Sequence, residues 1–187
     1  MIADNLQAIL SELPQGVRLV AVSKFHPIEA LQEAYEAGQR IFGENRPQEF
    51  AMKAVQLPQD IEWHFLGHLQ TNKLKLVLPY AHVVESVDSL HLLDAINAWG
   101  GKNGRAINVL LEVHIGAEQT KQGFSPDEIP SVLEDAQNYP NIRFCGLMGM
   151  ASHTSDTRLI RDDFMRIKAL FDACRSAFPS LVDFECL

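Results

Sequence analysis

Short apolar, β-rich runs alternate with helical patterns along the whole chain, and this alternation constrains the fold more than any other feature of the sequence. The runs are apolar on both faces, which is typical of a parallel sheet that helices cover on both sides or that closes into a barrel. The helical patterns have the expected punctuation, with Pro27 opening one and Gly38 following it. We predict strands over residues 17–23, 40–43, 62–67, 82–86, 107–114, 143–150 and 182–187.

The loop after the first predicted strand decides between an open sheet and a barrel. A doubly wound sheet usually carries a glycine-rich phosphate loop there, whereas this chain has no glycine in residues 23–27. In a (β/α)8 barrel, side chains from the ends of many strands converge on one site. We therefore expect a parallel (β/α)8 TIM-type barrel, with 1–187 as a single domain. Polar residues do follow successive strands, namely Lys24, Glu44, Asn45, His68, Gln70, Ser86, His114, Ser152 and His153.

Composition limits the classes of partner. The 187 residues are 47% apolar and carry a net charge of −8, so they can build a core but lack the basic surface that non-specific nucleic-acid binding needs. No apolar run reaches the roughly 20 residues of a membrane helix, so we expect no membrane partner. The cysteines Cys145, Cys174 and Cys186 form no CxxC pair, and we expect reduced thiols in a cytoplasmic protein.

Lys24 is the candidate nucleophile. A lysine at the mouth of a barrel is partly desolvated, which favours the neutral amine that forms a Schiff base with a carbonyl compound. The local sequence is equally compatible with a solvated loop lysine. Asn45 could support this amine or a ligand, or it could cap the helix that begins near Pro47.

Histidines and methionines near later strand ends are weaker candidates. His64 and His68 are four residues apart, but no third ligand has suitable spacing, so we expect no metal. Met148 and Met150 flank Gly149, a residue small enough to let a flat ring approach the strand. Both methionines could equally fill the core.

The motifs together resemble those of the pyridoxal-phosphate homeostasis proteins, also called proline synthetase co-transcribed homologues. The fold of that family resembles the N-terminal barrel of alanine racemase. The block over residues 63–73 is the most specific of the matching motifs. In chain order these are AVSK (21–24), FGEN (42–45), WHFLGHLQTNK (63–73), VESVDS (84–89) and GLMGMA (146–151).

The resemblance implies roles for individual residues in binding pyridoxal 5′-phosphate (PLP). Lys24 would carry the cofactor as a covalent Schiff base with Asn45 beside it, His64 would line the mouth, and Met148 and Met150 would face the ring. Family members hold the phosphate with segments that would follow Leu187. We therefore expect the barrel to lack the end of strand seven and strand eight, which roughly 40 further residues would complete.

The resemblance also implies a function. We expect a monomeric, non-catalytic PLP-binding protein that acts in cofactor supply and in the balance of amino acids and keto acids, with PLP-dependent apo-enzymes as possible partners. An amino-acid racemase is the main rival hypothesis, and it needs a second acid/base group on the other face of the substrate Cα. Tyr35, Tyr80 and Tyr139 are expected at the wrong end of the barrel for this. A lysine-dependent aldolase and a pure interaction module are two further hypotheses for the function.

Overall fold

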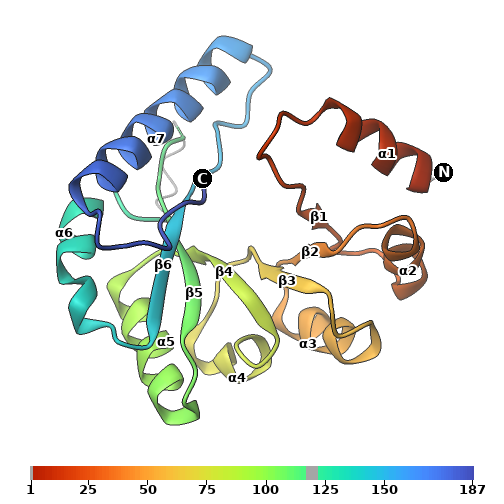
Figure 1. Ribbon diagram of the computed structural model, residues 1–187, viewed down its shortest axis with the longest axis horizontal. Coiled ribbons are helices and arrows are strands. Elements are labelled where there is room, and N and C mark those ends of the chain that lie inside the picture. The colour runs from red at the N-terminus through yellow and green to blue at the C-terminus, as the bar shows by residue number, and fades with distance from the viewer. Residues whose placement is uncertain (1, 117–121) are drawn as a thin grey trace. The chain divides into compact units, whose positions relative to one another are not determined.

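The computed structural model describes residues 2–116 and 122–187 (Figure 1). Its strands are β1 Ala21–Val22, β2 Ile41–Glu44, β3 Glu62–Phe65, β4 Ala81–Val87, β5 Ile107–Glu112 and β6 Ile142–Met148. Its α-helices are α1 Ile2–Glu12, α2 Ile28–Glu36, α3 Pro47–Gln56, α4 Leu74–Val77, α5 Leu90–Asn103, α6 Ile129–Glu134 and α7 Thr157–Ala177. Two 3-10 helices, η1 Thr71–Lys73 and η2 Asp135–Asn138, complete the elements of the described chain.

The strands form one sheet in the order β1-β2-β3-β4-β5-β6, so neighbours in the sheet are also neighbours in the sequence. The pairs β1–β2, β2–β3 and β5–β6 are parallel. This confirms the predicted parallel α/β class, although the sheet is open within the described residues. The strand predicted over 182–187 is wrong, because that segment forms a single parallel bridge between Cys186 and Gly146.

The described chain forms two compact units, which are considered one at a time. The first comprises Met1–Gly67 with Lys75–Val83, and the second comprises His68–Leu74 with Val84–Leu187.

An aromatic cluster forms the core of the first unit. Phe50 of α3 packs edge-on against Trp63 and Phe65 of β3, with ring centroids 5.7 Å apart in both pairs, and Phe42 of β2 lies 5.9 Å from Trp63. Helix α3 therefore covers the face of β2 and β3 that carries these rings (Figure 1). Pro47 starts α3 because proline is favoured in the first turn of a helix and restricts the preceding residue to an extended conformation.

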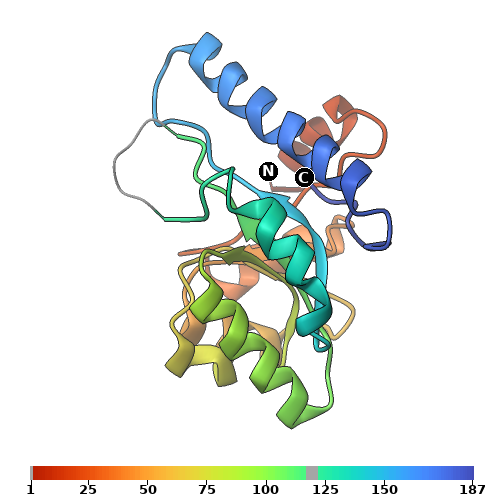
Figure 2. The same cartoon turned by 90° about the vertical axis from the view of Figure 1, so that its left-hand side faces the viewer.

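The long helices of the second unit are α5, green in Figure 2, and α7, blue there, and both have capping residues. The Ser89 hydroxyl accepts the Leu92 N–H at the start of α5, and Gly104 ends α5 in the left-handed conformation. The Asp156 carboxylate accepts the N–H groups of Arg158 and Leu159 at the start of α7. These contacts are local in the sequence, so each cap is set by residues next to the helix end that it stabilises. Among the described residues, no helix has the length and apolar character to cross a membrane.

Candidate functional site

Lys24 lies in a tight turn that directly follows β1. The His26 N–H donates to the Ser23 carbonyl over 3.1 Å, which closes a four-residue turn with Lys24 and Phe25 at its centre. Phe25 has a φ of +66°, the value that a type II turn requires at its third position. A left-handed residue other than glycine costs roughly 1–2 kcal/mol, so the surrounding structure must hold this turn.

The side chain of Lys24 is exposed, and none of the described residues pairs with it. The expectation that burial partly desolvates this amine is therefore wrong, since the neighbouring Val22 is also 49% exposed. The lysine is available for a ligand, but its surroundings in this structure do not exclude water.

A buried ion network lies against the same turn. Lys53 of α3 is 1% exposed, and its ammonium donates to Glu44 over 2.6 Å, to Glu49 over 2.7 Å and to the Ser23 carbonyl over 2.8 Å. Glu49 also accepts the Phe25 N–H over 3.0 Å. Its pKa is lowered chiefly by the hydrogen bond from Lys53. The buried ammonium of Lys53 is thus matched by two carboxylates and a carbonyl, which offsets the cost of taking it out of water.

Three adjacent strands bring the predicted residues of the first unit to one edge. Val22, Gly43 and His64 are in register across β1, β2 and β3. The ladder continues beyond them, because the Ser23 N–H donates to the Gly43 carbonyl over 2.9 Å. Lys24 and Asn45 each follow this row by two residues, so both lie where their strands end. The structure thus brings Lys24, Asn45 and His64 to the carboxyl ends of neighbouring strands.

Asn45 does not cap α3, so that interpretation of it is wrong. Arg46 occupies the N-cap position, and its side chain makes no capping hydrogen bond. The Asn45 Oδ1 atom is buried and accepts no hydrogen bond from any residue that the structure describes. A buried acceptor without a donor is costly, and here it marks a place for a donating ligand or water. Gly67 approaches closely, since a Cβ there would lie 2.1 Å from the Asn45 carbonyl oxygen.

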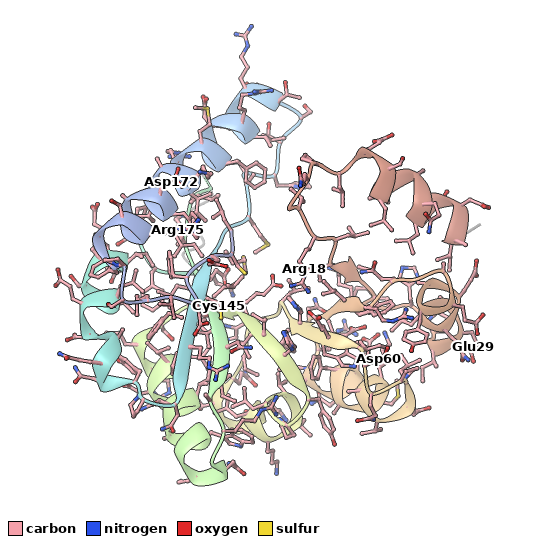
Figure 3. All side chains as sticks on the ribbon, in the orientation of Figure 1. Arg18, Glu29, Asp60, Cys145, Asp172 and Arg175 are labelled. Atoms are coloured by element: carbon pink, nitrogen blue, oxygen red, sulfur yellow. The ribbon has the colours of Figure 1, made fainter. Side chains whose placement is uncertain are left out.

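His64 is half-buried beside other ionisable groups of the first unit. Its ring stacks on that of His82, with centroids 6.1 Å apart and an interplanar angle of 17°. His82 lies 3.7 Å from Glu62, which also pairs with Arg18, one of the side chains labelled in Figure 3. Strand β3 thus has polar residues, Glu62 and His64, that alternate with the aromatic residues Trp63 and Phe65.

The end of β6, in the second unit, carries the predicted methionines. Met148 is half-buried and Met150 is 64% exposed, so neither is a fully buried core residue. Gly149 gives room to aliphatic side chains, since a Cβ there would lie 2.7 Å from Ile167 and 2.9 Å from Ile115. The approach of a flat ring at this glycine stays a prediction.

An acidic group in the second unit was not predicted as a site. Glu112 ends β5 and is buried, and burial raises its pKa, to which the negative charge of Asp88 adds. His68 Nδ1 lies 2.8 Å from Asp88 Oδ2, and its charge opposes the rise. The pattern of the predicted strand contained Glu112, but nothing in that pattern showed that Asp88 would lie nearby.

A second buried carboxylate holds the loop after β6. Asp163 of α7 accepts the Ser152 N–H over 2.8 Å and pairs with Arg166. The Ser152 N–H is the main cause of the lowered pKa of Asp163. Ser152 was predicted among the polar residues at strand ends, and the structure gives its backbone a structural contact.

Comparison with known proteins establishes the family. Residues 1–184 match the family of the alanine racemase N-terminal domain. A pyridoxal phosphate homeostasis protein of Pasteurella multocida is 33% identical over 184 residues, which cover 95% of this chain and 79% of that protein. The chain belongs to the pyridoxal phosphate homeostasis protein family.

Solved structures agree with this family. The structure of PipY from Synechococcus elongatus without PLP has a TM-score of 0.90 and 33% identity, and covers 96% of this chain and 84% of that one. PipY has also been solved with PLP bound, with a TM-score of 0.86 and 32% identity over the same shares. The alanine racemase from E. faecalis shares the fold at a TM-score of 0.71, with 18% identity, over 90% of this chain and 48% of that one.

Proposed function

We propose that this chain is a single domain that binds PLP covalently through Lys24 and acts in cofactor homeostasis without catalysing a reaction. The observation that carries the proposal is the exposed Lys24 amine, held in a fixed turn at the end of β1 in a member of this family. PLP supplies an aldehyde conjugated to an electron-withdrawing ring. Lys24 would hold PLP by forming a carbon–nitrogen double bond with the aldehyde carbon, with the aldehyde oxygen leaving as water.

The other predicted residues suit the rest of the ligand. The unsatisfied Oδ1 of Asn45 would accept a hydrogen bond from it or from a bound water, and the half-buried ring of His64 offers a polar contact near the carboxyl end of β3. Met148 and Met150 would offer polarizable apolar contacts to a ring.

The choice of Lys24 over nearby Lys53 follows from charge pairing. Lys53 donates to two carboxylates and a carbonyl and is 1% exposed, so it has no free amine to offer an aldehyde. Lys24 has no partner among the described residues. An exposed attachment site also suits reversible loading and release, which transfer of PLP to apo-enzymes in the cytoplasm would require.

The test is attachment of PLP to the purified protein. We expect an absorbance band from the carbon–nitrogen double bond on addition of PLP, and reduction with borohydride should place the pyridoxyl group on the peptide containing Lys24. Lys24→Met should abolish this label while leaving the unfolding midpoint unchanged, because the side chain is exposed. The matched control is Lys73→Met. A label that persisted in Lys24→Met, or that lay mainly on Lys73, would contradict the proposal.

Racemase activity is the second candidate, and the tyrosines argue against it. The Tyr35 hydroxyl donates to Asp60 over 2.8 Å, and this bond raises the Tyr35 pKa. The ring also stacks on Arg40, which directly precedes β2, so Tyr35 lies at the amino end of that strand. We expect PLP-loaded protein to show no exchange of the alanine Cα proton with D2O at enzyme-like rates, roughly 1–10³ s⁻¹. Exchange in that range would show a racemase-type enzyme instead.

A further inference from the structure

The peptide that joins Lys24 and Phe25 has two possible orientations. Type I and type II turns differ by a flip of this central peptide, and only type II places the third residue at positive φ. Phe25 is the only non-glycine among the described residues with a positive φ. Burial of its ring does not explain this choice, because Phe25 is 65% exposed. The ring does contact one side chain, the Arg46 guanidinium, which lies 4.5 Å from its centroid. The backbone of the turn has contacts of its own, and these act on the central peptide directly.

One ion pair of α3 contacts that peptide and the peptide before it. Glu49 Oε1 accepts the Phe25 N–H over 3.0 Å, and Lys53 Nζ donates to the Ser23 carbonyl over 2.8 Å. The two side chains also bind each other over 2.7 Å. A flip of the central peptide would turn the Phe25 N–H away from Glu49, so the carboxylate would lose a charge-assisted hydrogen bond. The pair therefore favours the type II orientation directly.

We infer that Glu49 and Lys53 are positioning residues that hold the peptide between Lys24 and Phe25 in the orientation that presents the Lys24 amine to PLP. This rests on the proposed function of Lys24. Glu44 anchors Lys53 from the strand side, since both side chains are at most 1% exposed and lie 2.6 Å apart. The lowered pKa of Glu49 keeps its carboxylate an anionic acceptor at neutral pH.

A role limited to stability would have different consequences. Glu49 is also an acidic residue in the first turn of α3, where a negative charge stabilises any helix. Glu29 has the same place in the first turn of α2, and Figure 3 labels it at the surface. Glu29→Met is therefore the matched control for the loss of an acidic residue at a helix start. Glu49→Gln is the conservative variant, because it keeps an oxygen that can accept the Phe25 N–H.

The test combines Glu49→Met with Phe25→Gly, since glycine adopts positive φ without strain. We expect Glu49→Met to weaken PLP affinity about 5- to 30-fold. This factor corresponds to the free energy that a residue other than glycine loses in the left-handed conformation. Glu49→Gln and Glu29→Met should stay within about 3-fold of the wild type. Adding Phe25→Gly to Glu49→Met should bring affinity back to within about 3-fold of Phe25→Gly alone. A purely stabilising role gives no such rescue.

Hydrogen exchange of the Phe25 amide is the readout that needs no cofactor. We expect its protection to fall in Glu49→Met and to be kept in Glu49→Gln and Glu29→Met. Unchanged protection in Glu49→Met, or no rescue by Phe25→Gly, would overturn the inference. Failure of the wild type to take PLP at Lys24 would overturn the proposed function instead, and the exchange measurement would still decide whether Glu49 holds the turn.

Discussion

The two units bury carboxylates in opposite ways. In the first unit, Glu44 and Glu49 share the ammonium of Lys53, so burial of charge is compensated and the pKa of Glu49 falls. In the second unit, Glu112 is buried near Asp88, and its pKa rises. Burial acts to raise the pKa of both Glu49 and Glu112, and only at Glu49 does a neighbouring cation outweigh it. The first arrangement also holds the turn after β1, whereas the second makes Glu112 easier to protonate than an exposed glutamate.

The largest change in stability is expected when Lys53, the buried cation shared by Glu44 and Glu49, is replaced. Lys53→Met leaves Glu44 and Glu49 without their shared partner, and losing one member of a buried ion pair typically costs about 3–5 kcal/mol. Urea unfolding should show a loss of this size. The control is Lys168→Met, which removes a lysine–carboxylate pair that is exposed on both sides and worth at most about 1 kcal/mol. Equal losses in the two variants would mean that the buried network contributes no more than a surface pair.

A smaller effect is expected from Asp163, a buried acid of the second unit that accepts a hydrogen bond and forms an ion pair. Asp163→Asn removes the charge that accepts the Ser152 N–H and pairs with Arg166, so we expect a loss of about 1–3 kcal/mol at neutral pH. Because the folded-state pKa of Asp163 is lowered, its contribution is present above the unfolded-state pKa and is lost as pH falls through the folded-state pKa.

Urea unfolding of both proteins at pH 7 and in acid measures this effect. The gap between wild type and Asp163→Asn should narrow in acid. Asp172→Asn, which breaks only the exposed pair with Lys168, serves as the control and should change stability little at either pH. A gap that widened in acid would refute the lowered pKa of Asp163.

The smallest effect concerns Glu112, whose contribution to stability depends on pH in the opposite sense to that of Asp163. The folded-state pKa of Glu112 is raised, so the unfolded chain ionises first and stability falls as pH rises from the unfolded-state pKa to the folded-state pKa. Glu112→Gln cannot ionise and escapes this fall. We therefore expect the variant to gain stability relative to the wild type as pH rises from about 4 to about 7 in urea unfolding. A constant difference across this range would show that Glu112 titrates normally.

The sequence predicted the architecture well where the signals are local. The alternating patterns predicted all six observed strands, and the helix start expected near Pro47 is the one that the structure has. The first strand was predicted too long. The Leu19 carbonyl accepts a hydrogen bond from the Gln39 side chain instead of from the backbone of a neighbouring strand. That contact joins residues far apart in the chain, so no local pattern could show it.

The candidate site was predicted only in part for the same reason. Lys24 and Asn45 could be chosen because each follows a strand. Lys53 could not, since a lysine in a helix is usually solvated, and its burial depends on Glu44 and on the carbonyl of Ser23, 30 residues earlier. The left-handed Phe25 was also beyond prediction, because phenylalanine has no preference for that conformation.

The close approach of Gly67 to Asn45 limits which mutations this part of the chain can tolerate. Even a methyl group at position 67 would meet the Asn45 carbonyl oxygen at 2.1 Å, so every substitution there displaces the neighbouring strand end. Gly16 and Gly104 have open space around them, and only their positive φ restricts replacement. Under random mutagenesis with selection for folded protein, position 67 should stay glycine in nearly every survivor, whereas positions 16 and 104 should drift.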